Sequence, residues 1–423
     1  MDSGSYNRLV LLLAACATLV LAGFNFIVDP YGNFDVPRIA GLNELHLGFN
    51  RHPLLAKSLA ASRIEPTSIV LGNSRPESAY EPGHSGFESP AYNLAVGGAR
   101  LGQVRRYLLE ALATGRLRQV FLATDLGMFD PSLGTDQDIP EVFMLTNDSG
   151  KSAGAARKWL RLAFVLLSGT ASTDSWWSFR HQGDPVVVYL PSGVREESAD
   201  ERQVEREGGH RSASLRIESV FLATMLRDVA SPEFPVAYGA LLDQLADTIA
   251  LAVERGVRVD IVIDPIHARF NYVYAVAGLW PTHEKWKRDL AALAARWPWS
   301  VSLWDFSGVS PCTSEPMPAA GDATSKMHWY RESGHFRPRL GALVLDRVLG
   351  GGAGLCPGFG RKLDADTIED ALAGQRAALA RWVADHAEDV AEIDALARRY
   401  RGPPPKTLFG TSQVEKLSRN PLH

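Results

Sequence analysis

The sequence predicts an α/β protein with a three-layer parallel sheet, and one recurring pattern is the main reason. Short β-branched runs such as SIVLGNS and VRVDIVIDP alternate with amphipathic stretches such as LGQVRRYLLEALATG. This alternation is typical of parallel sheets whose two faces are covered by helices. Because it continues to the helical stretch RPRLGALVLDRVLG, we expect one α/β domain over residues 29–350.

An apolar run near the N-terminus predicts a membrane helix. Leu9–Val28 contains no charged residue, and a helix of this length spans about 30 Å, the hydrocarbon thickness of a bilayer. Arg8 precedes the run and Asp29 follows it, a weak charge bias that keeps the N-terminus in the cytoplasm. We therefore expect a cytoplasmic tip over residues 1–6, an uncleaved signal anchor over residues 7–28 and export of the remaining chain.

Three other interpretations of this apolar run stay open. A cleaved signal peptide would have a shorter apolar core and a small-residue cleavage site. The segment LAAC, ending at Cys16, resembles a lipoprotein processing site, although the apolar run continues beyond it. A helix buried in the protein core is the third interpretation, which the terminal position and the all-round apolarity disfavour.

Two further segments interrupt or follow the predicted α/β domain. An insertion at about residues 130–232 is expected to be mostly helical, with a short strand in PVVVYLPSG and a solvated charged loop in REESADERQVEREGGHR. Insertions of this length usually form a lid over the site. A Gly-rich linker at residues 351–363 leads to residues 364–400, whose spacing predicts one amphipathic helix that packs on the body or on a partner. Residues 401–423 are expected to form a loose tail after the Pro-rich RGPPPK.

Composition narrows the classes of function. The net charge is −4, so the chain has no basic surplus for a phosphate backbone and we expect no nucleic-acid partner. No CxxC motif or His/Cys cluster occurs, and we expect no metal and no cofactor. Beyond Cys16 the chain contains Cys312 and Cys356, which would pair in an oxidising compartment; two free buried thiols are an equal alternative.

The candidate site begins with Ser74, which follows the strand-like run SIVLGN and precedes Arg75. Open α/β sheets keep their sites at the carboxyl ends of the parallel strands, so a serine at this point is a candidate nucleophile. A turn is the alternative, because Gly, Asn, Ser and Pro are all turn residues. The companions of Ser74 elsewhere in the chain decide between the two interpretations.

Three later blocks contain suitable companions. YNLAVGGA places Asn93 and Gly98 at the end of a second strand, and FLATDLGMFD places Asp125 at the end of a third. WYRESGHFRPRLG places Glu332 three residues before His335, at the entry to a C-terminal helix. Each block alone has a structural interpretation, such as a helix cap within ESGHF. Their order on the ends of separate predicted strands favours a catalytic site.

These residue types suit nucleophilic catalysis. A serine hydroxyl becomes a good nucleophile when a positioned imidazole removes its proton, and we assign this role at Ser74 to His335. Glu332 would accept a hydrogen bond from the other ring nitrogen and so fix the tautomer of the imidazole. An oxyanion requires N–H donors near 3 Å. The candidate donors are the amides of Ser74 and Gly98 and the side chain of Asn93 or Asn73.

Further polar residues near these strand ends are auxiliary candidates: Asn73, Arg75, Asp125, Asp264 and His267. Asp264 and His267 follow VRVDIVIDP on the same predicted edge of the sheet, which makes His267 a rival base or a substrate contact. A surface histidine in a Pro-containing loop is the alternative, and we prefer it slightly. Arg75 would steer an anionic group, or would pair with Asp125 or Glu77.

The order of the four blocks resembles the SGNH hydrolase superfamily, and most of all its membrane-anchored bacterial branch. That branch includes the alginate acetylation proteins and the teichoic acid D-alanylation protein. DPYGNFDVPRIAGLNE, around residues 29–45, also resembles the segment that follows the anchor in this branch. The resemblance implies a flavodoxin-like three-layer fold, with Ser74 as nucleophile and Gly98 as oxyanion donor. Asp125 and Glu332 stand where Asn and Asp are usual in the superfamily.

The resemblance also implies a function and a location. The chain would be an exported serine esterase or O-acyltransferase that acts on cell-envelope or secreted polysaccharide. Its partners would be a glycan or acyl-ester substrate and a membrane-bound acyl donor protein. The catalytic domain would lie on the periplasmic side of a bacterial inner membrane, held by a single pass. The departures at Asp125 and Glu332 slightly favour a second hypothesis, a catalytically inactive SGNH-like binding or scaffold protein.

Overall fold

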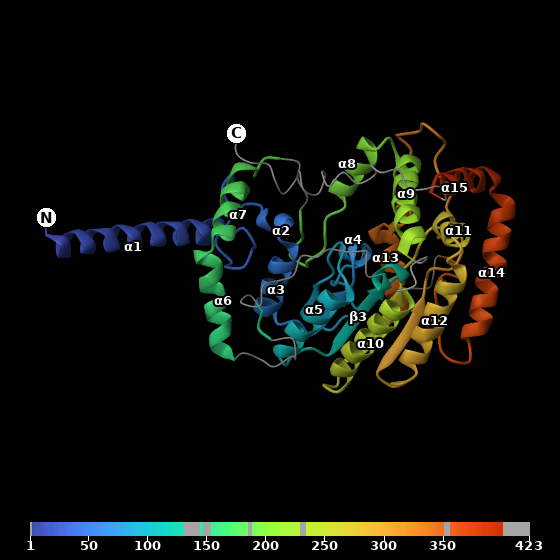
Figure 1. The fold of residues 1–423 in the computed structure, drawn as a ribbon, viewed down its shortest axis with the longest axis horizontal. Coiled ribbons are helices and arrows are strands. Elements are labelled where there is room, and N and C mark those ends of the chain that lie inside the picture. Colours follow the sequence, from blue (N-terminus) through green and yellow to red (C-terminus); the bar gives the residue numbers. More distant parts are fainter. Residues whose placement is uncertain are drawn as a thin grey trace.

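The computed structural model describes residues 2–130, 144–146, 154–184, 188–228, 234–350 and 356–400. In these residues the chain forms a mixed α/β fold with fifteen α-helices, α1 to α15, around a mostly parallel central sheet (Figure 1). The α/β class and the parallel sheet predicted from the alternating pattern are therefore confirmed.

The central sheet has six strands in the order β2-β1-β3-β4-β5-β8. The first five are mutually parallel, and β8 pairs antiparallel with β5 at one edge. β-branched and aromatic residues dominate the central strands, as expected for strands buried on both faces. The bounds are β1 Ser68–Leu71, β2 Ala91–Asn93, β3 Gln119–Thr124, β4 Arg258–Ile263, β5 Val301–Asp305 and β8 Arg361–Leu363.

Alternate residues of each strand enter two separate cores. Ile69, Val120 and Ile261 pack with residues of α3 (Pro53–Ile64), α5 (Leu101–Ala113), α10 (Phe234–Val253) and α12 (Trp280–Ala294) on one face. Val70 and Phe121 pack with residues of α13 (Pro338–Leu349) on the other. Both faces of the sheet are thus covered, which leaves the carboxyl ends of the strands as the open edge.

Helix α1 (Ser3–Val28) projects from the body (Figure 1). It is long and apolar enough to be a membrane anchor or a signal sequence, with a mean hydropathy of 2.4 over its best window, of which 6% is buried. The interpretation as a core helix is therefore wrong. Asn25 and Val28 are the buried residues of α1, so the helix meets the body at its C-terminal end, which is followed by α2 (Gly48–Arg51).

The insertion is helical where the structure describes it. It contains α6 (Ala155–Leu167), α7 (Gly169–Arg180), α8 (Ser198–Arg206) and α9 (His210–Asp228). The expected strand in PVVVYLPSG lies partly outside the described residues, and the remainder forms only an isolated bridge between Tyr189 and Arg195.

The expected solvated loop in REESADERQVEREGGHR is wrong, because this segment contains α8 and the start of α9. Several of its charged side chains have long-range partners, although Glu205 and Arg206 are exposed. Buried Asp200 forms ion pairs with Arg195 and Arg331, and Arg337 forms ion pairs with Glu197 and Glu201. Sequence composition alone does not reveal such long-range pairing.

The predicted single C-terminal helix is also wrong. Two helices, α14 (Ile368–Asp385) and α15 (Ala387–Tyr400), are separated at His386. His386 Nδ1 lies 2.8 Å from the Trp382 carbonyl oxygen, and this turn directs α15 onto α9 and α11 (Ala268–Val276). Residues 361–363, expected in the linker, form β8. Residues 351–355 and 401–423 lie outside the described residues.

Cys312 and Cys356 form a disulfide with Cα atoms 6.0 Å apart, so the alternative of two free thiols is wrong. The bridge joins the segment after β5 to the segment before β8 across 44 residues of sequence. Cys16, on α1, is free and exposed. The closed loop includes the residues from which the predicted base and acid of the site come.

Candidate active site

Ser74 lies where β1 turns into α4 (Ser74–Ala79). Gly72 adopts φ 144°, and a Cβ atom at this position would lie 2.6 Å from Pro76 Cγ, so the turn requires glycine. The Asn73 side chain accepts a hydrogen bond from Arg75 N at 3.2 Å and caps the helix. The run LGNSR is therefore a strand–turn–helix that makes Ser74 the first residue of α4.

Glu332 and His335 face each other across a β-hairpin. Strands β6 (Tyr330–Glu332) and β7 (His335–Phe336) are antiparallel, and Glu332 pairs with His335 around the turn Ser333–Gly334. Glu332 Oε1 accepts a hydrogen bond from His335 Nδ1, and its Oε2 accepts one from Gly334 N at 2.7 Å. The alternative interpretation of ESGHF as a helix cap is wrong, because α13 begins only at Pro338.

The fold brings this hairpin to Ser74. The distance from Ser74 Oγ to His335 Nε2 is 2.8 Å, across 261 residues of sequence. Helices α4 and α13 pack closely on each other, since a Cβ atom at Gly341 would lie 2.0 Å from the Ala79 carbonyl oxygen. The expected proximity of the hydroxyl and the imidazole is thus present, and Ser74, His335 and Glu332 form a continuous hydrogen-bonded chain.

Burial and charge set the protonation states of this chain. Burial alone would raise the pKa of Glu332, but the charge and hydrogen bond of His335, together with nearby Arg331, lower it to about 2. Burial lowers the pKa of His335, and Glu332 opposes this effect only in part. At neutral pH the carboxylate is therefore ionised and the imidazole neutral. This is the state in which His335 Nε2 accepts a proton from a hydroxyl.

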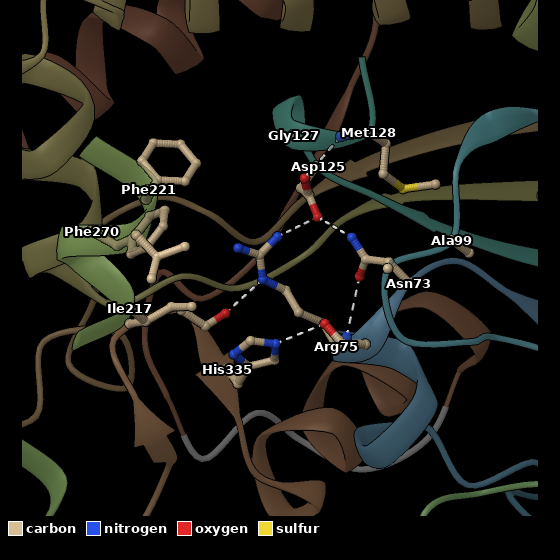
Figure 2. Close-up of a pocket in the computed structure, with 14 residues that line it drawn as sticks. Asn73, Arg75, Ala99, Asp125, Gly127, Met128, Ile217, Phe221, Phe270 and His335 are labelled. Carbon is tan, nitrogen blue, oxygen red and sulfur yellow. Dashed lines mark hydrogen bonds and ion pairs between the residues drawn. The ribbon is translucent and has the colours of Figure 1, made fainter. Parts of the chain in front are cut away.

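Buried Arg75 and Asp125 form a polar cluster with half-buried Asn73, the residue before Ser74 (Figure 2). Asp125, which caps the short 3₁₀-helix η1 (Leu126–Phe129), accepts hydrogen bonds from Asn73 Nδ2 at 2.5 Å and from Arg75. Arg75 Nε donates to the Gly334 carbonyl oxygen at 2.6 Å. Arg75 therefore fixes the hairpin turn to the end of β3. The sequence left open whether Arg75 pairs with Asp125 or with Glu77, and in the structure it pairs with Asp125.

Two backbone amides, those of Ser74 and Gly98, are the candidate oxyanion donors. Gly98 adopts φ 72° and lines the same cavity as Ser74. Among the described residues, neither the Ser74 N–H nor the Gly98 N–H has a hydrogen-bond acceptor. Gly97 N is occupied, since it donates to Glu77 Oε2 at 3.0 Å. The choice of Gly98 over Gly97 as the candidate oxyanion donor agrees with this geometry.

The assignment of Asn93 to the oxyanion hole is wrong. Asn93 is fully buried, and its side chain donates to the carbonyl oxygens of Pro76 and Tyr80 at 2.8 and 2.9 Å. Its Oδ1 accepts from Ala95 N at 2.9 Å. The side chain thus holds the end of β2 against α4 and the residue that follows α4, and Asn93 does not line the cavity.

Asp264 and His267 lie near the site but outside the cavity. Asp264 accepts a hydrogen bond from Tyr80 OH at 2.6 Å, and His267 caps α11 while its Nε2 contacts the Glu315 carbonyl oxygen at 2.8 Å. Both side chains are buried. His267 is therefore not a rival base, and the structural role that we preferred is the correct one, although the histidine is buried rather than on the surface.

A cavity of about 190 Å³ opens at Ser74 and His335. Ile217, Phe221 and Phe270 lie on one side of it, and Ala99 and Met128 on the other (Figure 2). The volume is below the roughly 300–1,000 Å³ of sites for drug-sized ligands. The cavity is thus small, with polar residues around Ser74 and His335 and apolar side chains on two sides.

The sequence did not reveal that α9 lines one side of this cavity, with Ile217 and Phe221. Ile217 and Phe221 are one helical turn apart in SLRIESVFLATML, a spacing that could have indicated an apolar face of the insertion. On another face of α9, buried Glu218 pairs with Arg269 of α11 at 2.9 Å, and Arg269 also pairs with Asp389 of α15. The C-terminal helices therefore secure the cavity wall.

Comparison of the chain with protein-family models, with curated proteins and with solved structures finds no match.

Proposed function

We propose that this chain is a serine esterase or O-acyltransferase of the SGNH hydrolase type that acts on cell-envelope or secreted polysaccharide. One observation carries the proposal: Ser74 Oγ lies 2.8 Å from His335 Nε2, while the other ring nitrogen of His335 bonds to ionised Glu332. The strand order β2-β1-β3-β4-β5 supports it, because doubly wound flavodoxin-like sheets have this order. Their ligands bind where the order reverses, next to β1 and β3, and Ser74 and Asp125 follow these two strands.

The mechanism follows from the positions of the three side chains. His335 Nε2 takes the Ser74 proton as Oγ attacks the ester carbonyl, and Glu332 stabilises the imidazolium that forms. His335 then gives the proton to the departing alkoxide, which leaves an acyl ester on Ser74. Water or a sugar hydroxyl, deprotonated by His335, attacks this ester. The bond from Ser74 Oγ to the acyl group then breaks, His335 returns the proton to Oγ, and the acid or the acylated sugar is released. Hydrolysis and transfer differ only in the second nucleophile.

The negative oxygen of each tetrahedral intermediate needs donors. The amides of Ser74 and Gly98 are the backbone donors that we propose, because both border the cavity. Asp125 accepts hydrogen bonds and provides no such donor. The third donor that we propose is the side-chain amide of Asn73, which also lines the cavity. Asp125 would then orient this amide rather than contact the oxyanion.

The cavity indicates the kind of acyl group. Its apolar walls and volume of about 190 Å³ suit a short acyl chain such as acetyl. A sugar ring, which is larger and rich in hydroxyl groups, would remain at the opening. We therefore propose a small acyl ester as the group held inside and a glycan as its carrier or acceptor, with a membrane-bound protein as the acyl donor in the transferase case.

We further propose that α1 is retained as a single-pass anchor and that the site lies on the periplasmic side of a bacterial inner membrane. Asn25 Nδ2 donates to the Leu166 carbonyl oxygen at 2.8 Å, and Asn43 Nδ2 donates to the Ile27 carbonyl oxygen at 2.7 Å. Cleavage after α1 would remove these contacts from the body. The disulfide supports export, because such bonds persist in oxidising compartments.

A fluorophosphonate probe tests the proposal on the full chain in nanodiscs. The wild type should be labelled at one serine, and Ser74→Ala should abolish labelling. Ser78→Ala is the matched control, since Ser78 lies on the same helix one turn further along and does not line the cavity. This variant should be labelled like the wild type.

The same experiment addresses the second candidate function. An inactive binding or scaffold protein is favoured by Asp125, because an acceptor stands where an oxyanion donor is usual in the superfamily. If the wild type is not labelled although circular dichroism shows that it is folded, the catalytic proposal fails and the scaffold function replaces it. If the wild type is labelled, the release of acetate from p-nitrophenyl acetate with and without oligosaccharide acceptors separates hydrolysis from transfer.

A further inference from the structure

The residues of α6 that are described as exposed are all apolar, whereas Arg161 is buried and Arg157 and Lys158 are half-buried. The exposed positions are two alanines, a tryptophan, two leucines and a phenylalanine: Ala156, Trp159, Leu160, Ala163, Phe164 and Leu167. These follow the i, i+3, i+4, i+7 spacing of a single helix face. Arg161, on the opposite face, is almost fully buried and pairs with Glu110 of α5 at 3.1 Å. A helix on the surface of a soluble protein normally shows the reverse pattern.

Apolar exposure continues onto α7 and the base of α1. Trp176 and Phe179 are exposed on α7, and Phe26 and Ile27 are exposed in the last turn of α1. In the parts of the chain that the structure describes, the exposed large apolar side chains lie on α1, α6 and α7, with four exceptions: Ile39, Leu190, Val220 and Trp299. The exposure is thus concentrated in one region rather than scattered over the surface.

These helices meet at the point where α1 leaves the body. Asn25 donates to the Leu166 carbonyl oxygen in α6 and, at 3.0 Å, to Ser172 Oγ in α7. Figure 1 shows α6 and α7 running across the base of α1, while α14 and α15 lie at the opposite end of the molecule. A helix that lies on a membrane around a spanning helix would have this arrangement.

We propose that α6 and α7 form an interfacial platform that rests on the lipid bilayer around the exit point of α1. The proposal rests on α1 as a membrane span. The apolar face of α6, with Trp159 and Phe164, would enter the boundary between headgroups and acyl chains. Trp176 would lie at headgroup level, where tryptophan is enriched. The exposed guanidinium of Arg180, 5.7 Å from the centre of the Trp176 ring, would face anionic headgroups.

A bilayer fits this surface better than a protein partner for two reasons. The apolar face of α6 is continuous with the apolar base of α1, so a membrane that surrounds α1 would meet α6 directly. The described exposed positions of α6 include no charged residue, whereas protein interfaces usually have a polar rim. The platform would also restrict tilting of the body on its single anchor and so hold the cavity at a fixed height above the membrane.

Fluorescent labelling of single cysteines in the full chain tests this platform. Trp159→Cys and Trp299→Cys, each in a Cys16→Ala background, replace the same residue type at two exposed positions, 73% and 96% exposed. Trp299 lies between α12 and β5, and it is the matched control because Figure 1 shows α12 on the side of the body away from α1. Wild-type Cys16, within α1, reports on the span itself. Each protein carries an environment-sensitive NBD label in vesicles of phosphatidylcholine and phosphatidylglycerol, with doxyl-labelled lipid as quencher.

The platform predicts three different results. NBD at position 159 should lose more than about half of its fluorescence to doxyl groups placed near the headgroups and should be shielded from aqueous iodide. NBD at position 299 should respond to iodide alone. NBD at Cys16 should be quenched best by doxyl groups deep in the acyl chains.

The outcomes that overturn the platform are distinguishable from failure of the anchor. If position 159 behaves like position 299 while Cys16 is quenched by lipid, α1 spans the membrane and the platform is wrong. Shielding of position 159 from both quenchers would identify a second protein copy as the occupant and also overturn the proposal. If lipid quenches neither Cys16 nor position 159, the anchor and the platform are both wrong. Ala163→Cys, on the same face, replaces Trp159→Cys if that variant does not fold.

Discussion

Two segments beside the candidate site place an acid three residues before a histidine, Asp264/His267 and Glu332/His335, and only the second forms a hydrogen-bonded pair. Glu332 bonds to His335, and His335 contacts Ser74. Asp264 and His267 bond to other partners, Tyr80 OH and the Glu315 carbonyl oxygen. The two segments touch each other, since His267 N donates to the Ser333 carbonyl oxygen at 3.0 Å. The two segments therefore lie in the same part of the molecule, and their side chains still have different hydrogen-bond partners.

Backbone conformation explains the difference. The turn at Ser333–Gly334 places Glu332 and His335 opposite each other on a hairpin, so their side chains meet. Pro265 and Ile266 follow β4 without regular secondary structure, and His267, with φ −64° and ψ 150°, caps α11, which begins at Ala268. The same spacing thus directs one pair of side chains together and the other pair apart. Spacing in sequence is informative only when the intervening residues are known to turn.

Ionisation follows the contacts. Burial raises the pKa of Asp264 to about 8, which the Tyr80 hydrogen bond and Arg75 only partly oppose. Glu332 is equally buried, but its interactions with His335 lower its pKa to about 2. Burial lowers the pKa of His267 to about 4. At neutral pH one segment therefore has a carboxylate beside a catalytic-type imidazole, and the other has two neutral side chains.

Replacing the two histidines should give the largest contrast. If the proposed triad is catalytic, His335→Ala should lower ester hydrolysis by about 10⁴-fold or more, because Ser74 loses its base and removal of a triad member has an effect of this size in serine proteases. His267→Ala should retain most of the activity per folded molecule. It should instead lower the melting temperature, since it removes the cap of α11 and a buried contact. Steady-state rates on p-nitrophenyl acetate and thermal unfolding of both variants measure the contrast.

Equal loss of rate in the two variants, with both folded, would show that the catalytic base is not specified by contact with Ser74. Retention of activity by His335→Ala would exclude the proposed triad altogether. Labelling of the same variants with fluorophosphonate provides a second readout that does not depend on the choice of ester.

Replacing the two acids should give a smaller contrast. Glu332→Gln keeps the size of the side chain but removes the charge that stabilises the imidazolium, so we expect a loss of about 10²–10⁴-fold in kcat. Asp264→Asn should change kcat little, because Asp264 is neutral at pH 7 and does not line the cavity. Glu332→Asp is the conservative control and should recover part of the rate. Comparable losses in Glu332→Gln and Asp264→Asn would refute the distinction between the two acids.

Opening the disulfide should loosen one segment and leave the other in place. The bridge between Cys312 and Cys356 closes a loop of 44 residues that carries Glu332 and His335, whereas Asp264 lies outside this loop. In the chain-entropy model such a loop is worth about 4 kcal/mol of unfolding free energy. We expect Cys312→Ser/Cys356→Ser to lose stability of this order in urea unfolding. Hydrogen exchange should increase more in residues 330–336 than in residues 258–267.

Much of the fold was predictable because its signals are local. The alternation of strands and helices, the apolar run of α1 and the strand ends that carry Ser74 and Gly98 all depend on short stretches of sequence. The pairing of Glu332 with His335 was expected at the correct spacing, but as part of a helix entry. A Ser–Gly pair suits either a helix start or a tight turn, so the sequence does not distinguish these two conformations.

The unpredicted parts depend on partners far away in sequence. Asn93 had the chemistry of an oxyanion donor, but its hydrogen bonds to Pro76 and Tyr80 exist only in the folded chain. The charged segment around Asp200 forms α8, and buried Asp200 pairs with Arg331, more than a hundred residues later. Residue type indicates which interactions a side chain is able to form, and only the fold determines which of them it forms.

The dependence of stability on pH provides the finest test of the comparison. The pKa of Asp264 rises from 3.8 to about 8 on folding, so between these values the folded chain holds a proton that the unfolded chain has lost. The free energy of unfolding should therefore fall as the pH rises through this range, by at most about 1.4 kcal/mol per pH unit. Glu332 acts in the opposite direction and below pH 4.5, because its contribution is lost as the pH falls towards 2. A window from pH 6 to pH 7 thus excludes its effect.

Asp264→Asn should remove this contribution, because an amide mimics the protonated acid and still accepts the Tyr80 hydrogen bond. Urea unfolding at pH 6 and pH 7 should show a drop in the wild type that exceeds the drop in Asp264→Asn by about 1 kcal/mol. Both proteins contain the same histidines, so any contribution of these side chains cancels in the difference. Identical changes in the two proteins would mean that Asp264 is ionised in the folded state. The contrast between the two acid–histidine segments would then lie in their contacts alone, and not in their charge.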